Sequence, residues 1–284
     1  MSLAAYERPL EWATRHSPER IAAVGVLALR IRRYRSEGVP PGLAPIAGLR
    51  VKAAGHPERP GWHDSTGLYG FLRLPPGDTR IEVDDPAGRF QAQALSVDVP
   101  DRSAVREALE AGTPPAGPAP RFLEVALRPT PTMALPPATT ALWGVVRDGT
   151  RPVPGALLAL STVLSGLADR VTGLSGPDGS YVLVLPGEAI DRSVNPPLRQ
   201  FARTLTVRVP RPPLAAALSA EGFLAAQPAN VFSLTAAGRD ALFMPRDFQL
   251  RDSGGTLFPQ VGGLNPSASV SIGLQVRLDI ELLP

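Results

Sequence analysis

Apolar and polar residues alternate along several stretches of the chain, which is the pattern of a β-strand with one buried face. The first clear example is 27–32, which reads Leu-Ala-Leu-Arg-Ile-Arg. The C-terminal stretch 270–282 has the longest alternation, and we expect a single long strand there. Further strands are expected over 47–54, 68–74, 79–84, 90–98, 121–128 and 141–147. The pattern therefore predicts an all-β fold built from many strands.

Turn-forming residues are abundant between these stretches. The 284 residues include 33 prolines and 27 glycines, and both types are unfavourable inside regular elements and concentrate in turns and linkers. The proline-rich stretch 129–137 is the best candidate for a linker, and proline-dense linkers are semi-rigid spacers. A chain of this length is long enough for two domains that each bury a core of their own.

We therefore expect two antiparallel β-sandwich domains preceded by a short N-terminal arm or helix. The expected boundaries are 1–20 for the arm, 21–128 for the first sandwich, 129–139 for the linker and 140–284 for the second sandwich. An insertion around 188–245 is expected in the second sandwich, and its alanine-rich piece 214–224 suits short helices.

The chain contains an internal repeat, whose first copy covers 46–51 and 64–77 and whose second copy covers 153–158 and 176–187. Gly67 matches Gly179, and Tyr69 matches Tyr181. In both copies a glycine-containing turn reverses the chain, an aromatic residue starts an alternating strand, and Pro and Gly end it. We expect both tyrosines to be core or corner residues of duplicated sandwiches.

Further turn and core residues extend the second copy: Gly144, Val146, Asp148, Pro152, Val153, Gly155, Ala156, Pro186 and Gly187. Together with Gly179 and Tyr181, this pattern resembles the carboxypeptidase regulatory-like domain, a prealbumin-like β-sandwich. The second copy departs from that family at Gly176, where an acidic residue is usual, and the first copy lacks the opening Gly-x-Val-x-Asp. The resemblance implies two prealbumin- or Ig-like sandwiches. It rests on turn and core residues, so it implies a fold rather than an activity.

Charge gives little support for a nucleic-acid partner. The formal net charge is only +3, and Lys52 is the sole lysine. The densest basic cluster lies within 30–35 and has one aromatic neighbour, Tyr34, whereas nucleic-acid grooves combine basic and stacking residues at several places. We interpret the cluster as a solvated strand face and expect no nucleic-acid partner. Arg33 and Arg35 remain candidates for contact with a protein.

Residues for catalysis or cofactor binding are scarce. The absence of cysteine excludes disulfides, thiolate catalysis and cysteine-ligated metal sites. No Gly-x-Ser-x-Gly motif and no phosphate-binding loop occur. The carboxylate pair Asp84-Asp85 precedes a proline and is read as part of a turn. We therefore predict a non-enzyme with no catalytic residue and no cofactor.

The three histidines offer two weak metal-site hypotheses. His16 and Glu19 have the His-x-x-Glu spacing of zinc carboxypeptidases, but such a site needs a third ligand. His56 and His63 flank a loop that also holds Glu58, together with the neighbouring Asp64. We interpret both histidines as exposed loop residues and predict no metal.

Trp62 is the one aromatic residue that we expect in an exposed loop, between Gly61 and His63. It either contacts a ligand or partner or caps the sandwich. The residues predicted to contact a partner are therefore Trp62, His63, Arg33 and Arg35.

No run reaches the ~18–20 apolar residues of a membrane helix, and the first residues show no secretory signal. We expect synthesis in the cytoplasm, no membrane insertion, and incorporation into a released or virion-like particle.

Domains of this family without a signal peptide resemble those attached to phage-tail-like contractile injection systems. That resemblance implies a structural or adaptor protein in a multi-subunit assembly, with protein partners and a homo-oligomeric or ring arrangement. One alternative is a cell-surface or envelope module that binds carbohydrate or a partner protein. A regulatory subunit that lacks its catalytic partner is the remaining alternative.

Overall fold

The computed structural model describes residues 25–35, 42, 44–101, 103, 106–107, 110–111, 123–137, 139–164, 167–185, 200–220, 222–254, 267–271 and 273–284. The N-terminal arm expected over 1–20 lies outside these residues. The chain divides into two compact units. Unit 1 draws on 1–33, 42–86 and 92–127, and unit 2 draws on 34–41, 87–91 and 128–284.

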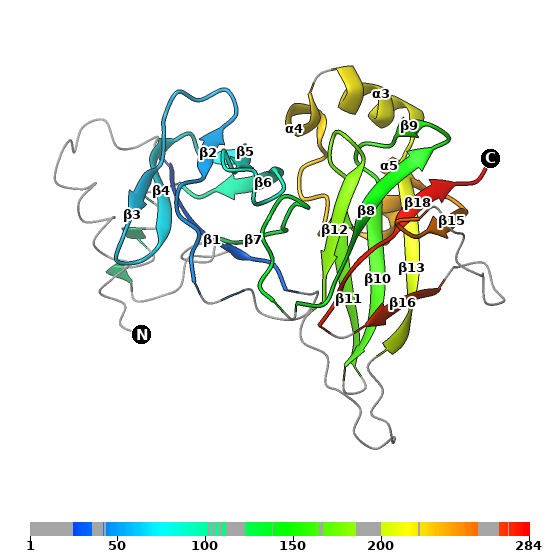
Figure 1. Cartoon of the computed structure of the whole chain (residues 1–284). Helices are drawn as coiled ribbons and strands as arrows, with labels where there is room; N and C mark the ends of the chain where they lie inside the picture. The colour runs from blue at the N-terminus through cyan, green and yellow to red at the C-terminus, as the bar shows by residue number, and fades with distance from the viewer. Residues whose placement is uncertain are drawn as a thin grey trace. The chain divides into compact units, whose positions relative to one another are not determined.

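Unit 1 is a β-sandwich of two sheets (Figure 1). The first sheet has the order β3 (Gly61–His63), β4 (Leu68–Leu74), β1 (Gly25–Arg33) and β7 (Leu123–Leu127). The second has the order β2 (Arg50–Ala53), β5 (Gly77–Asp84) and β6 (Gln93–Val99). All pairs are antiparallel except β1 with β7, which is parallel. The core draws fully buried side chains from both sheets, among them Leu29, Phe71, Ile81 and Val83.

Unit 2 is a larger sandwich, in which the first sheet has the order β12 (Ser180–Val184), β8 (Ala141–Asp148), β18 (Asp279–Leu282) and β15 (Phe248–Arg251). Strands β9 (Arg151–Pro152) and β17 (Gln275–Arg277) also pair with β8. The second sheet has the order β11 (Leu167–Leu174), β10 (Leu157–Leu164), β13 (Gln200–Pro210) and β14 (Phe243–Pro245), with β16 (Ser267–Ser271) against β13. One hydrophobic cluster joins the two sheets and includes Val146, Tyr181, Leu160, Val207 and Ile280.

The two units share a strand order, which confirms the duplication that the sequence repeat predicts. The order β4-β1-β7 in unit 1 corresponds to β12-β8-β18 in unit 2, and β2-β5-β6 corresponds to β10-β13-β14. In each unit the opening strand pairs antiparallel on one side and parallel with the last strand on the other. The units differ at one edge, because β3 pairs with β4 whereas β11 pairs with β10.

Each strand expected from the alternating pattern has a counterpart, namely β1, β2, β4, β5, β6, β7 and β8. The single long strand expected over 270–282 is wrong. The chain leaves β16 in one sheet and enters β17 and β18 in the other. Between them Gly273 has a φ of 75°, in the left-handed region, and Leu274 is 58% exposed. The alternating pattern cannot distinguish one long strand from two strands that lie in different sheets.

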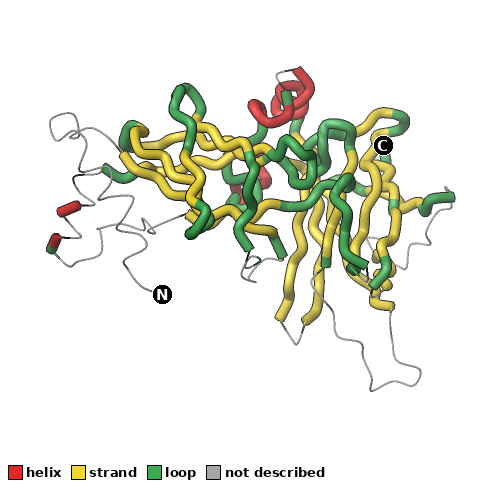
Figure 2. The backbone as a smooth tube through the Cα atoms, turned by 60° about the vertical axis from the view of Figure 1, so that its left-hand side comes forward, coloured by secondary structure: helices red, strands yellow, loops and turns green. Residues whose placement is uncertain are grey.

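The described part of the insertion expected at 188–245 contains α3 (Pro212–Ala220), α4 (Phe223–Ala226) and α5 (Ala236–Leu242), shown in red in Figure 2. Short helices at 214–224 are therefore confirmed. They accompany a small apolar cluster that includes Leu157, Val231 and Phe243. Strands β13 and β14 also fall in this range but belong to the second sheet of the sandwich.

The proline-rich stretch 129–137 belongs to unit 2. There the hydroxyl groups of Thr130 and Thr132 donate hydrogen bonds to the carbonyl of Gly88. The proposal that 129–139 acts as a stiff linker, and the boundaries 21–128 and 140–284, stay predictions.

Candidate functional site

Trp62 lies on a strand rather than in an exposed loop, so that expectation is wrong. It forms the middle of β3 opposite Tyr69 and is half-buried. The two ring centroids are 4.8 Å apart with an interplanar angle of 54°. The indole N–H donates to the carboxylate of Asp64 in the turn that follows. This packing matches the alternative in which Trp62 caps the sandwich.

The carboxylate of Glu58, which the sequence placed near two histidines, binds backbone groups instead. Its two oxygens accept hydrogen bonds from the amides of Leu72 at 2.8 Å and Arg73 at 2.9 Å. These amides lie at a register shift between β4 and β1, where the pairing moves from Leu27–Phe71 to Gly25–Leu74. A bulge of this kind leaves amides without a ladder partner, and Glu58 supplies the acceptors.

Of the two histidines that flank this loop, His63 is hydrogen-bonded within the turn that follows it. The Nδ1 atom of His63 is 3.0 Å from the hydroxyl of Thr66, and Glu58 and Asp64 are engaged as described above. Among the described residues, no group of three or more His, Cys, Asp or Glu side chains is arranged to hold a metal ion. The hypothesis involving His16 and Glu19 lies outside the described residues.

The arginines of β1 are not the solvated face that we expected. The side chains of Arg30 and Arg32 are only 16% and 17% exposed, and both reach Glu124 on the parallel strand β7, at 3.9 and 3.5 Å. Arg33 ends β1 and is half-buried, and this burial lowers the pKa of its guanidinium. Arg35 is exposed.

The four predicted contact residues are spread over different elements of the fold. Trp62 and His63 are neighbours on β3. Arg33 lies on β1, from which β3 is separated by β4. Arg35 belongs to unit 2. A joint contact surface of these four residues stays a prediction.

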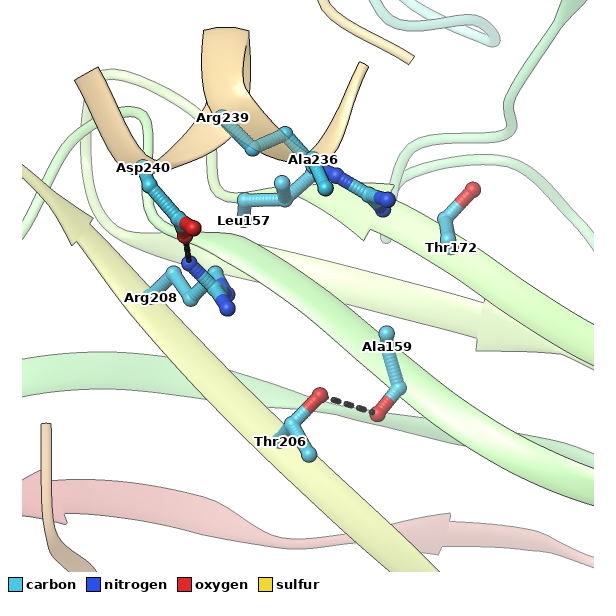
Figure 3. A pocket seen from close by; sticks show the side chains of 8 residues that line it. All are labelled: Leu157, Ala159, Thr172, Thr206, Arg208, Ala236, Arg239 and Asp240. Atoms are coloured by element: carbon cyan, nitrogen blue, oxygen red, sulfur yellow. Dashed lines mark hydrogen bonds and ion pairs between the residues drawn. The ribbon is translucent and has the colours of Figure 1, made fainter. Parts of the chain in front are cut away.

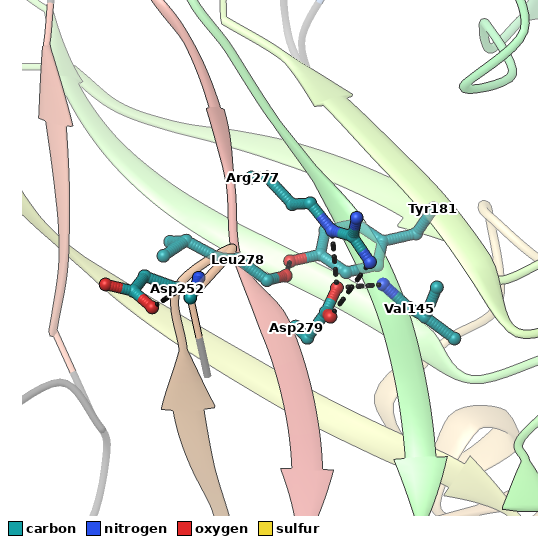
Figure 4. Close-up of polar contacts among 7 residues, drawn as sticks. Val145, Tyr181, Asp252, Arg277, Leu278 and Asp279 are labelled. Carbon is teal, nitrogen blue, oxygen red and sulfur yellow. Dashed lines mark hydrogen bonds and ion pairs between the residues drawn. The ribbon is translucent and has the colours of Figure 1, made fainter. Parts of the chain in front are cut away.

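The matched tyrosines of the repeat are both buried and both bind backbone groups, which confirms them as core or corner residues. The Tyr69 hydroxyl accepts from the amide of Leu49 at 3.0 Å and donates to the carbonyl of Ile46 at 3.1 Å. The Tyr181 hydroxyl donates to the carbonyl of Leu278 at 2.6 Å (Figure 4). Complete burial, with the nearby charge of Asp279, raises the pKa of Tyr181 far above its usual value.

The carbonyl that Tyr181 binds also explains Gly144. A Cβ atom at Gly144 would collide with the carbonyl group of Leu278. Here the ladder between β8 and the last strands is interrupted, and the amide of Val145 donates to the carboxylate of Asp279 at 3.1 Å. Arg277 holds that carboxylate from the other side, at 3.1 Å. These groups build a joint between β17 and β18.

A buried arginine ties three chain segments of unit 2 together. The guanidinium of Arg128 lies over the rings of Tyr34 and Phe232, 3.9 and 3.3 Å from their centroids. Its Nε donates to the carbonyl of Thr172 at 2.8 Å, and its Nη2 donates to the Thr172 hydroxyl at 2.7 Å. Arginine suits this place because its planar group stacks and donates at the same time.

A small cavity of about 100 Å³ opens on the outer face of the second sheet of unit 2, beneath α5 (Figure 3). Two arginines line it, and one of them, Arg208, is paired with Asp240. Its full lining is Leu157, Ala159, Thr172, Thr206, Arg208, Ala236, Arg239 and Asp240. The cavity is too small for an extended substrate, since drug-sized ligands occupy roughly 300–1,000 Å³.

Sequence reasoning missed this cavity entirely. The alternation of Leu205, Val207 and Val209 with Thr204 and Arg208 would have indicated β13. No sequence pattern indicated that α5 would line the cavity, because tertiary packing decides where the helix lies on the sheet.

No protein-family model matches the chain, and no curated protein matches it. None of the described helices is long and apolar enough to cross a membrane.

Solved structures of pilins give remote matches. The minor pilin GBS52 of Streptococcus agalactiae is 10% identical, with 92% of this chain and 97% of that chain covered and a TM-score of 0.21. The major pilin subunit BcpA of Bacillus cereus is 10% identical, with 84% and 55% covered and a TM-score of 0.23. The shaft pilin SpaA of Lactobacillus rhamnosus GG is 9% identical, with 92% and 98% covered and a TM-score of 0.21. TM-scores this low support no conclusion about function. The assignment of two β-sandwich units rests on the sheets described above.

Proposed function

We propose that this chain is a non-catalytic structural or adaptor protein of a multi-subunit assembly. The supporting observation is a duplicated sandwich in which polar side chains in and between the repeat segments are bonded to the fold itself. Glu58 accepts from two backbone amides, and Tyr69 and Tyr181 donate to backbone carbonyls. A catalytic acid, base or nucleophile must instead reach a substrate.

The sheet edges support assembly through strand contacts. Strands β7 and β6 end their sheets in unit 1, and each has one partner strand among the described sheets. Edge strands offer backbone donors and acceptors to another chain, and strand addition is a recurrent mode of protein association.

At a finer level, the proposed assembly is a phage-tail-like contractile injection particle, and the proposed domain type is the carboxypeptidase regulatory-like sandwich. The support is the repeat itself, with Gly144 and Tyr181 at positions where that domain has them. The protein would be made in the cytoplasm and become part of the particle, through homo-oligomeric or ring contacts.

Sedimentation velocity of the purified full chain over a range of concentrations tests the general proposal. We expect oligomers, or co-assembly with partners that are identified by mass after isolation from the native cell. Sheath, tube or baseplate subunits among those partners would support the finer placement. A persistent monomer that binds glycans, with binding lost in Trp62→Ala, would overturn the proposal in favour of a binding module. A metal-dependent hydrolytic activity of the pure protein would overturn the non-enzyme assignment.

A further inference from the structure

We propose that the cavity beneath α5 is a binding site for a single carboxylate group. This inference concerns unit 2 alone and holds whether or not the chain is part of an assembly. It rests on the arrangement of the floor, on the charges around the opening and on the size of the space.

The floor of the cavity is built by cross-strand neighbours on three adjacent strands. Ala159 on β10 lies opposite Thr172 on β11 and opposite Thr206 on β13. In the next row of the same face, Leu157 lies opposite Arg208. The intervening residues of these strands point into the sandwich core. A sheet holds such rows rigidly, so the site is formed before any ligand arrives.

The charges around this floor leave a positive excess. Arg208 and Arg239 contribute two positive charges and Asp240 one negative charge, and Asp240 is paired with Arg208. No described carboxylate pairs with Arg239. Figure 3 shows its side chain reaching from α5 along the sheet toward Thr172. A guanidinium presents donors in a planar fork that matches the two oxygens of a carboxylate.

Thr172 adds a hydroxyl donor to the same space. Its oxygen accepts a hydrogen bond from Arg128 at 2.7 Å and lies 3.4 Å from the Tyr34 hydroxyl. When Tyr34 donates to this oxygen, the Thr172 proton is left to point into the cavity. Arg128 is buried between two rings and also holds the Thr172 carbonyl at 2.8 Å. This contact fixes the wall from which the hydroxyl points.

The remaining walls favour a carboxylate over a phosphate or sulfate. Leu157, Ala159 and Ala236 give the cavity an apolar side, which suits the short aliphatic stem of a carboxylate. A tetrahedral oxyanion would turn at least one oxygen toward these carbons without a donor, and burying such an oxygen is unfavourable. The volume of about 100 Å³ admits one small group and excludes a sugar ring or a folded peptide segment.

Titration of the isotope-labelled full chain with propionate, followed by backbone amide NMR at constant ionic strength, tests the site. We expect saturable shifts confined to the lining residues. Propionamide has the same shape without the charge and should cause no such shifts.

Arg239→Gln should weaken propionate binding by about tenfold or more, because a charge-assisted fork is lost. Arg239→Lys keeps the charge and should give an intermediate affinity. Arg147→Gln, at an exposed arginine of β8, is the matched control and should bind like the wild type.

A blocked tripeptide, acetyl-Gly-Glu-Gly-amide, distinguishes the two sources of the carboxylate. If it binds at least as tightly as propionate and its glutamine analogue does not bind, the site accepts an acidic side chain of a protein. If only propionate binds, the ligand is a free small carboxylate.

Three results would overturn the proposal. The first is the absence of saturable propionate shifts in the wild type. The second is equal binding by wild type and by an Arg239→Gln variant whose amide spectrum shows a folded unit 2. The third is inorganic phosphate binding as tightly as propionate.

Discussion

At the scale of single residues, Gly144 and Tyr181 act on the same carbonyl group. Leu278 approaches β8 so closely that position 144 has no room for a Cβ atom, and its carbonyl then accepts the Tyr181 hydroxyl. In unit 1 the register position opposite Tyr69 is occupied by Leu29. The Tyr69 hydroxyl binds Ile46 and Leu49 rather than a carbonyl of the last strand. The close approach of Leu278 thus explains the glycine at position 144.

Gly144→Ala should lower the free energy of unfolding by about 3 kcal/mol or more, since backbone must move to admit the methyl group. Urea denaturation followed by circular dichroism measures the change. Gly61→Ala is the matched control, because this strand glycine has open space around its Cβ position. Equal stability of the two variants would contradict the assigned collision with Leu278.

Tyr181→Phe should destabilise the protein by about 1–3 kcal/mol, because a buried carbonyl loses its donor. Tyr69→Phe should have an effect of at least the same size, since both an amide and a carbonyl lose their partner. Thermal and urea unfolding of both variants test this expectation. A Tyr181→Phe variant as stable as the wild type would show that the hydroxyl is not needed to satisfy Leu278.

At the scale of elements, the turn before β12 is held by a charged side chain as well as by a glycine. Gly179 has a φ of 75°, which favours glycine. Asp178 accepts hydrogen bonds from the amide and hydroxyl of Ser180, at 3.0 and 2.6 Å. Partial burial acts to raise the pKa of Asp178, but these two bonds and a third from its own backbone amide outweigh it and lower the pKa overall.

A lowered pKa makes this turn sensitive to acid. The contribution of Asp178 to stability should be fully present above the usual aspartate pKa of about 3.9 and be lost as the pH falls through the lower folded value. Asp178→Asn should therefore be less stable than the wild type at pH 7, and the difference should shrink at acidic pH. The side chain is exposed, so we expect an effect below about 1 kcal/mol. Unfolding curves at several pH values test this, with Asp148→Asn as an exposed control; a difference that grows on acidification would contradict it.

At the scale of the whole molecule, each sandwich is closed by pairing of its opening strand with its last strand. These pairs are parallel, β1 with β7 and β8 with β17 and β18. Parallel neighbours need a long connection between them, and here nearly the whole unit forms that connection. The last strand therefore makes core contacts that depend on the whole unit lying between it and the opening strand.

Removal of residues 275–284 should prevent stable folding of unit 2. The deletion takes away the buried side chains of Leu278, Ile280 and Leu282, and each contributes about 1.5–3 kcal/mol. Their sum is comparable to the roughly 5–15 kcal/mol stability of a typical domain. Limited proteolysis and circular dichroism should show a susceptible unit 2, whereas removal of 283–284 alone should have a small effect. Native-like resistance of the long deletion would contradict this account.

The sequence by itself determined the features that depend on neighbours in the chain. Alternation gave the strands from β1 to β8 in all but one case, the missed strand being β3, and the glycine and tyrosine positions revealed the duplication. These features are local, because side-chain direction reverses at every strand residue and positive φ angles favour glycine wherever they occur.

The tertiary structure alone decided features that depend on distant segments. It split the stretch 270–282 between two sheets, assigned Glu58 to a bulge, placed Trp62 against Tyr69 and brought α5 over the sheet to form the cavity with Arg239. The physical reason is that an apolar or charged side chain specifies the kind of environment that it requires. The segment that supplies this environment is selected by packing of the complete fold.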